Sequence, residues 1–343
     1  MPPALHQFIE RESGAIRTEA LYADGLVRLL YREVRENAPI LFRLFTSARM
    51  SGVLGFLNFD LPLAGKLAGN RRFLAECGVD LADCVEPPAH FDSPRKIFER
   101  QIRYWECRPQ PDDRAAVVSP ADARVLVGSF RDTSLLFIKE KFFSFTELIG
   151  ADRPQWLDAF RGGDFAVFRL TPDKYHYNHV PVAGRVADIY ELPGEYHACN
   201  PGAVVEMVTP FSKNRRVVTV IDTDVPDGTG VGLVAMVEVV ALMIGHIVQC
   251  YSASRYEAPQ PIEPGMFLAR GSVKSLYRPG SSTDLLLFEA GRVEFAADLI
   301  RNRHNRLAAS RFSFGFGEPL VETDVAVRSL IATPRQGEEK SHA

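Results

Sequence analysis

The sequence has little cysteine and no excess of either charge, and both features narrow the class of protein. Its 343 residues include five cysteines, an odd number, and no C-x-x-C pair. We therefore expect neither a disulfide framework nor a zinc ribbon, and the chain suits a reducing, cytoplasmic compartment. A formal net charge of -3 supplies no basic surface, so nucleic acid is not an expected partner.

Several functional and targeting motifs are also missing. The sequence has no Walker A loop, no G-x-G-x-x-G after a strand and no G-x-S-x-G elbow. The N-terminal segment MPPALHQFIERESG lacks the apolar stretch of a secretory signal. The longest apolar run, 231–248, is rich in valine and carries Glu238 and His246. It predicts one or two buried strands with a turn, and not a membrane span.

Apolar periodicity changes near residue 110. Before that point, 26–37, 39–50 and 93–106 show helical spacing, and Ser93-Pro94 is a plausible helix start. After it, short runs rich in Val, Ile, Phe and Thr are separated by Gly, Pro and Asp. This pattern predicts an α+β fold with N-terminal helices packed on a mainly antiparallel β core.

The predicted organisation has three parts. We expect a helical N-terminal region over 1–110, a β-rich catalytic domain over 111–333 and a disordered polar tail over 334–343. Within the first part, Ile40 to Ala64 mixes arginine with aromatic and aliphatic residues. It is too interrupted to span a bilayer, so it either docks on a membrane surface or is a buried amphipathic helix.

Three local features could carry chemistry. Asp122 lies in the turn SPAD before a strand, His176 and His179 lie in DKYHYNH after a strand, and Ser281, Ser282 and Thr283 precede the apolar run LLLF. Each has an ordinary alternative: an Asx-turn, a pair of structural histidines and a Pro-Gly-Ser turn. The histidines could instead perform acid/base work or, with His197, bind a metal.

Taken together, these segments resemble one family, the phosphatidylserine decarboxylases, which are self-cleaving pyruvoyl enzymes. SPAD is similar to that family's S-P-x-D-G, and DKYHYNHVPVAG to its D-Y-H-R-x-H-x-P-x-x-G. RGSVKSLYRPGSSTDLLLF resembles G-x-x-x-G-x-F-x-x-G-(G)-S-[ST]-x-x-x-L-F. IKEKFFSFTELIG and SKNRRVV match two further segments, and the order holds from about Phe91 to Phe288. The N-terminal ninety residues are not covered.

The sequence departs from the family pattern after the SPAD segment and at the cleavage motif. Ala123 replaces a glycine, and Ser281 stands where a glycine usually precedes the cleaved serine. Counting back from Phe288 makes Ser282 the cleaved serine, whereas counting forward from Tyr277 selects Ser281. We prefer Ser282, because the downstream strand fixes how the new terminus enters the site.

The resemblance implies a mechanism and a role for each residue. Ser282 would attack the preceding carbonyl, and chain cleavage would convert this serine to a covalent pyruvoyl group. That group would accept the substrate amine and serve as an electron sink. His179 would be the base for the serine and Asp122 would orient it, while His176 would lie near the substrate carbon. Thr283 or backbone amides would stabilise the oxyanion.

The resemblance also implies the substrate and partners. We expect a peripheral, membrane-associated enzyme that converts phosphatidylserine to phosphatidylethanolamine. Its large and small chains are expected to stay associated after cleavage, and the protein could form a homodimer. No metal is expected. The altered GSST motif and the divergent N-terminal region leave a soluble amino acid open as the substrate. A third alternative is a non-catalytic or metal-binding β module that uses His176, His179 and His197.

Overall fold

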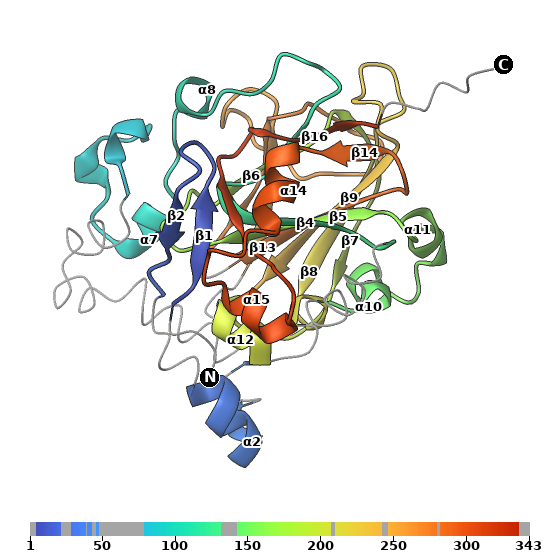
Figure 1. Cartoon of the computed structure of the whole chain (residues 1–343). Helices are drawn as coiled ribbons and strands as arrows, with labels where there is room; N and C mark the ends of the chain where they lie inside the picture. Colours follow the sequence, from blue (N-terminus) through green and yellow to red (C-terminus); the bar gives the residue numbers. More distant parts are fainter. Residues whose placement is uncertain are drawn as a thin grey trace.

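The structure is a computed structural model of a mixed α and β chain (Figure 1). It describes residues 5–21, 29–38, 40–42, 46–47, 79–131, 143–206, 210–241, 246–279 and 282–335. Most of the segment 40–64, together with Gly280 and Ser281, therefore lies outside the described residues.

A ten-stranded sheet forms the centre of the molecule. Its strand order is β11-β7-β8-β9-β13-β5-β4-β15-β1-β2, and every pairing is antiparallel except β1 with β15. The mainly antiparallel core predicted from the sequence is confirmed. The strands are β1 (Gln7–Glu10), β2 (Ile16–Thr18), β4 (Ala123–Ser129), β5 (Asp164–Leu170), β7 (Gly184–Leu192), β8 (Arg216–Asp222), β9 (Leu233–Val240), β11 (Phe267–Leu268), β13 (Ser282–Phe288) and β15 (Thr323–Val325).

Two three-stranded sheets complete the β core. One contains β10 (Ile247–Ser252), β12 (Val273–Tyr277) and β6 (Tyr177–His179). The other contains β14 (Val293–Phe295), β16 (Leu330–Pro334) and β3 (Val117–Val118). The predicted polar tail thus begins at the end of a strand, because Pro334 closes β16.

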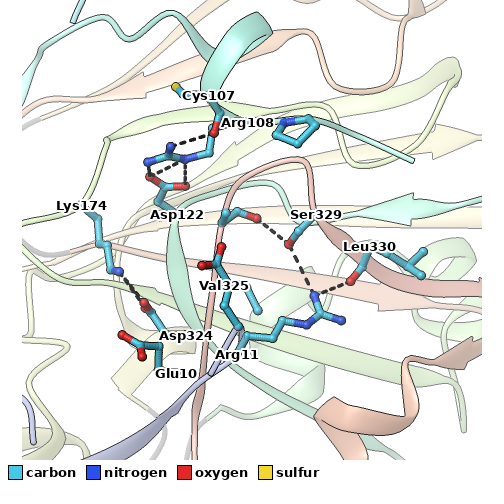
Figure 2. Close-up of a pocket in the computed structure, with 13 residues that line it drawn as sticks. Glu10, Arg11, Cys107, Arg108, Asp122, Lys174, Asp324, Val325, Ser329 and Leu330 are labelled. Atoms are coloured by element: carbon cyan, nitrogen blue, oxygen red, sulfur yellow. Dashed lines mark hydrogen bonds and ion pairs between the residues drawn. The ribbon is translucent and has the colours of Figure 1, made fainter. Parts of the chain in front are cut away.

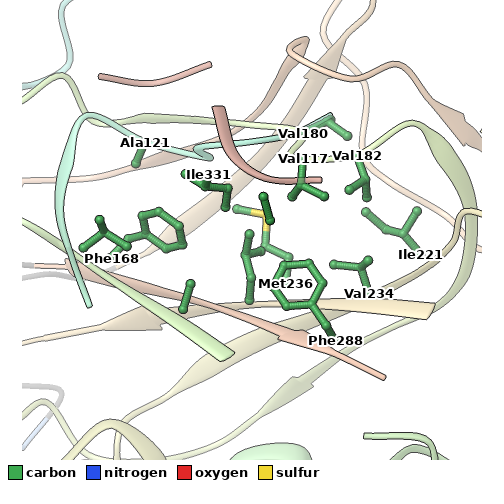
Figure 3. Close-up of a cluster of buried hydrophobic side chains, with 14 of the residues drawn as sticks. Val117, Ala121, Phe168, Val180, Val182, Ile221, Val234, Met236, Phe288 and Ile331 are labelled. Carbon is green, nitrogen blue, oxygen red and sulfur yellow. The ribbon is translucent and has the colours of Figure 1, made fainter. Parts of the chain in front are cut away.

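Strand β13 is buried on both faces, which explains its uninterrupted apolar run. Leu286 and Phe288 join one cluster with Met236 and Phe168 (Figure 3). Leu285 and Leu287 join a second cluster on the opposite face of the strand. Because side chains alternate along a strand, the odd and even positions of β13 are separated between these two clusters.

Short helices cover the ends and edges of the sheets. They are η1 (Leu30–Val34), α2 (Arg35–Asn37), η2 (Leu81–Asp83), η3 (Pro88–His90), α7 (Pro94–Phe98), α8 (Tyr104–Cys107), α10 (Phe145–Ile149), α11 (Pro154–Ala159), α12 (Pro201–Glu206), α13 (Pro210–Lys213), α14 (Ala297–Arg303) and α15 (Arg311–Phe316). No helix in the described ranges is both long and apolar enough to cross a bilayer.

The helix predicted over 93–106 is split into α7 and α8. Its start is as expected, since the Ser93 hydroxyl accepts a hydrogen bond from the backbone N–H of Lys96. The interruption has a tertiary cause: Ile102 forms an isolated antiparallel bridge with Cys84, which holds the chain extended between the two helices.

The run 231–248 contains β9 and the start of β10, as predicted. The expectation of a helical N-terminal region over 1–110 is wrong at residues 16–18, which form β2 and pair with β1. Periodicity missed this hairpin because β2 is short and exposed, so neither face shows a burial pattern.

A buried ion-pair network connects the N-terminal hairpin to the core. The Arg169 guanidinium of β5 lies 2.6 Å from carboxylate oxygens of both Glu19 and Glu322. His6 Nε2 lies 2.8 Å from Glu322. Although burial opposes it, the charge of Arg169 holds the pKa of Glu322 far below its ordinary value. The two carboxylates thus share one cation inside the protein.

We expect Arg169→Met to destabilise the fold by about 3–5 kcal/mol, because it leaves the buried Glu322 without its arginine and leaves Glu19 with only Arg124, 3.7 Å away. Urea unfolding followed by tryptophan fluorescence measures this change. Arg161→Ala is the matched control, because its ion pair with Asp158 is exposed and should contribute almost nothing. Equal shifts in both variants would contradict a stabilising role for the network.

Candidate functional site

Backbone hydrogen bonds join the histidine segment to the aspartate turn and to strand β12, which precedes the hydroxyl cluster. His179 N–H donates to the carbonyl of Pro120 at 2.7 Å, which joins DKYHYNH to SPAD. Strand β6 pairs with β12, and Tyr277 N–H donates to the carbonyl of His176 at 3.1 Å. The histidine segment therefore lies between the aspartate turn and the strand that leads to the hydroxyl cluster.

Asp122 is a buried, ionised carboxylate at the start of β4. Arg108 donates to it through Nε and Nη2, each at 3.0 Å, and the N–H of Val327 donates to Oδ1 at 2.7 Å. Burial opposes ionisation, but the Arg108 charge holds the pKa of Asp122 below its ordinary value. The carboxylate borders a pocket of about 560 Å³ in which Lys174 pairs with Asp324 (Figure 2).

His179 is fully buried and neutral. Its Nδ1 lies 2.9 Å from the carbonyl of Gly271, so Nδ1 carries the proton. Its Nε2 faces the Tyr175 hydroxyl at 3.0 Å and keeps its lone pair. Burial lowers the pKa of His179 to about 4. The Nε2 lone pair thus accepts a hydrogen bond from Tyr175. A neutral imidazole can accept a proton at pH 7 through this nitrogen when the hydroxyl is displaced. In the described ranges, no hydrogen bond joins His179 to Asp122.

His176 is equally buried and has unused hydrogen-bonding capacity. Its ring stacks on Phe98 with centroids 3.5 Å apart. The backbone of Lys174 is near the ring, but neither ring nitrogen makes a regular hydrogen bond. Burial, and then the charge of Arg100, lower the pKa of His176 well below its ordinary value. His176 is thus a neutral imidazole that stacks on Phe98, and among the described residues no regular hydrogen bond fixes its ring nitrogens.

Ser282 is the first residue of β13 and is fully buried between β9 and β5, opposite Val240 and Leu170. Its hydroxyl has no hydrogen-bond partner among the described residues. Thr283 points to the other face of the sheet, beside the Cys199 thiol. Ser281 lies outside the described residues. Among the described residues, no hydrogen bond joins Ser282 to His176 or His179.

The three histidines proposed as an alternative metal site do not cluster in the described part of the chain. His197 stacks on Phe42 and pairs with Glu195, away from the contacts of His176 and His179. Among the described residues, the side chains that lie close enough together to hold a metal ion are instead His6, Glu19 and Glu322. Arg169 already supplies the cation for that group.

Sequence patterns missed two parts of the site. Arg108 neutralises Asp122 from α8's C-terminal side, fourteen residues earlier in the chain, and no motif marks it. Glu238 and Asp284 are fully buried carboxyl groups directly opposite each other in β9 and β13. Their signal was visible, because each is an acidic residue next to or within an apolar strand-like run.

Comparison with known proteins gives one consistent result. Residues 95–314 match the family model described as phosphatidylserine decarboxylase. A phosphatidylserine decarboxylase proenzyme from Bordetella petrii is 31% identical over 239 residues, covering 65% of this chain and 78% of the relative. Proenzymes of the same description from Fusobacterium nucleatum and Chlamydia trachomatis serovar L2 are 24% and 29% identical over 88% and 85% of this chain. They are matched over 93% and 90% of their own lengths.

Proposed function

Because the chain belongs to the phosphatidylserine decarboxylase family and is a carboxy-lyase, we propose that it decarboxylates phosphatidylserine after cutting itself at Ser282. The products are phosphatidylethanolamine and carbon dioxide. One observation supports the proposal: backbone hydrogen bonds join three family segments, and the third of these segments leads to a buried serine whose hydroxyl has no partner among the described residues.

Maturation uses the chain's own groups. The Ser282 hydroxyl attacks the carbonyl of Ser281, which converts the amide to an ester. Elimination then releases the large chain as a carboxylate and leaves dehydroalanine at position 282. Hydrolysis of that residue expels ammonia and leaves a pyruvoyl group. Ser282 suits this group, because its buried, unpartnered Oγ has no competing structural bond to break. The group supplies a carbonyl that accepts electrons as carbon dioxide leaves.

The remaining residues supply proton transfer and charge. His179 accepts the serine proton through Nε2, since its neutral ring holds the other proton on Nδ1. Asp122 keeps a negative charge beside the histidine segment and stabilises the imidazolium that forms. Because Thr283 points to the other face, we assign oxyanion stabilisation to backbone amides. We place His176 near the substrate carbon that is protonated after carbon dioxide leaves.

Phosphatidylserine presents its headgroup at a bilayer, so we also propose that the enzyme docks on a membrane surface. The segment 40–64, most of which lies outside the described residues, is the sequence's candidate for this contact. Its Leu and Phe side chains would enter the headgroup boundary, and Arg43 and Arg49 would attract anionic lipid.

We therefore expect the intact protein to float with phosphatidylserine vesicles at low salt and to detach as salt screens the arginines. Phe56→Asp combined with Leu57→Asp should abolish flotation without preventing self-cleavage. Loss of self-cleavage in that variant would instead assign these side chains to the protein core.

The substrate is tested by incubating the mature protein with phosphatidylserine vesicles and with free amino acids, and measuring carbon dioxide release. The proposal predicts release from the vesicles. Turnover of a free amino acid alone would contradict the phospholipid substrate while leaving the self-cleavage chemistry in place.

A further inference from the structure

Buried polar atoms without partners gather at the start of β13. Ser282 Oγ, Asp284 Oδ2 and Asn178 Oδ1 are all buried, and none has a hydrogen-bond partner among the described residues. Ser282 and Asp284 are two residues apart in one strand, so they share a face at a Cα separation of about 7 Å. An unsatisfied buried polar atom costs about 1–3 kcal/mol. Three together mark a place that receives a hydrogen-bonding group.

Glu238 is the charged member of this cluster. Asn178 Nδ2, Gln249 Nε2 and Lys274 Nζ donate to it at 3.2, 2.8 and 2.7 Å. The Ser275 hydroxyl donates as well. Burial opposes ionisation, but the Lys274 charge and these donors hold the pKa of Glu238 below its ordinary value. Glu238 is therefore a carboxylate.

Asp284 is the neutral member. It lies directly opposite Glu238 in the β9–β13 ladder, where two negative charges would repel each other. Burial and the Glu238 charge raise the pKa of Asp284 well above its ordinary value. The Tyr277 hydroxyl lies 2.7 Å from Oδ1 and 3.2 Å from the carbonyl of Thr283. Its single proton is directed at the nearer acceptor, Oδ1, so the acid proton resides on Oδ2, which has no partner among the described residues.

Two members of this network depart from the family motif. Ser275 and Tyr277 stand where G-x-x-x-G-x-F has its second glycine and its phenylalanine. Each brings a hydroxyl that bonds to one of the two buried carboxyl groups.

We propose that Asp284 is a positioning residue for self-cleavage, whose Oδ2–H donates a hydrogen bond to one bridging water that in turn donates to the Ser282 hydroxyl oxygen. This inference rests on the proposed role of Ser282 as the nucleophile. A neutral acid leaves the serine proton free for His179. An ionised Asp284 would instead accept that proton's hydrogen bond and repel the negative charge that develops on Oγ.

The test is the pH dependence of self-cleavage in the full chain, synthesised without cells and followed by appearance of the small chain on gels. The wild-type rate should fall as pH rises through the raised pKa of Asp284. Asp284→Asn keeps a neutral donor and should cleave without that alkaline fall. Asp284→Leu removes the donor and should slow cleavage by about tenfold or more at every pH, the loss of one good hydrogen bond.

Glu238→Gln gives a second, independent variant. It removes the charge that raises the pKa of Asp284, so the alkaline fall should move to lower pH. The groups facing Asp284 from neighbouring elements are Glu238 on β9 and Lys274 and Tyr277 on β12, and none of them is changed in Asp284→Asn. An identical alkaline fall in wild type and Asp284→Asn would overturn the inference.

Folding provides a readout that does not require cleavage. In a Ser282→Ala background, a raised folded-state pKa means that stability is full below the unfolded pKa and is lost as pH rises through the folded pKa. Unfolding midpoints with and without Asp284→Asn should therefore diverge as pH rises, and parallel midpoints would overturn the neutral state of Asp284. A wild-type chain that never cleaves at any pH would overturn the proposed function and this inference with it.

Discussion

Replacing Ser282 with alanine should leave the chain uncut. Without Oγ no ester forms, and the peptide bond before residue 282 is then an ordinary stable amide. Denaturing gels should show one full-length band for Ser282→Ala, where the wild type shows a large chain and a small chain of residues 282–343. The small chain should also resist N-terminal sequencing, because its terminus carries no amine.

The matched control is the neighbouring serine. Ser281→Ala keeps the Ser282 hydroxyl and its carbonyl target, so it should still be cut. The opposite result, cleavage in Ser282→Ala and none in Ser281→Ala, would move the reactive position by one residue. Cleavage in both variants would reject serine chemistry in this loop.

Replacing the two histidines one at a time should give different defects, one in self-cleavage and one in decarboxylation. After Ser282→Ala, these are the largest effects that we expect. His179→Ala should remain uncut, because it removes the imidazole whose Nε2 accepts the serine proton. His176→Ala should still be cut, but its decarboxylation rate should fall about 10²- to 10⁴-fold, the usual contribution of a positioned acid or base. Gels measure the first effect and carbon dioxide release from phosphatidylserine measures the second.

Asp122→Ala is the companion to His179→Ala. It removes the negative charge beside the histidine segment, leaves Arg108 without its partner and should also remain uncut. Equal cleavage in all three variants would remove this group from the maturation chemistry. Stoichiometric zinc in the wild type that is lost from His176→Ala would favour a metal site instead.

The β core was predictable from the sequence because its signals are local. The runs that became β9 and β13 are apolar on both faces, and they lie at the centre of the sheet, where both faces are covered. The N-terminal hairpin was not predictable, because β1 joins the sheet through β15, more than three hundred residues away in the chain. A short exposed strand such as β2 is specified by this pairing and not by its own composition.

The candidate site was also only partly predictable from the sequence. Asp122, His176, His179 and Ser282 were proposed from motif order. Backbone hydrogen bonds join the segments of Asp122 and the two histidines, and Tyr277, five residues before Ser282, bonds to His176. The contact between Arg108 and Asp122 required the fold, since spacing along the chain says nothing about distance across it. The neutral state of Asp284 follows only from Glu238 opposite it in the ladder.

Intact mass measurement of the purified protein shows whether this chain makes its own carbonyl cofactor at residue 282. We expect two masses, a chain ending at Ser281 and a chain of residues 282–343 whose N-terminal serine has become pyruvoyl. Reductive amination should add mass only to the small chain. A single, stable, full-length mass in freshly purified active protein, unchanged by that treatment, would contradict the account.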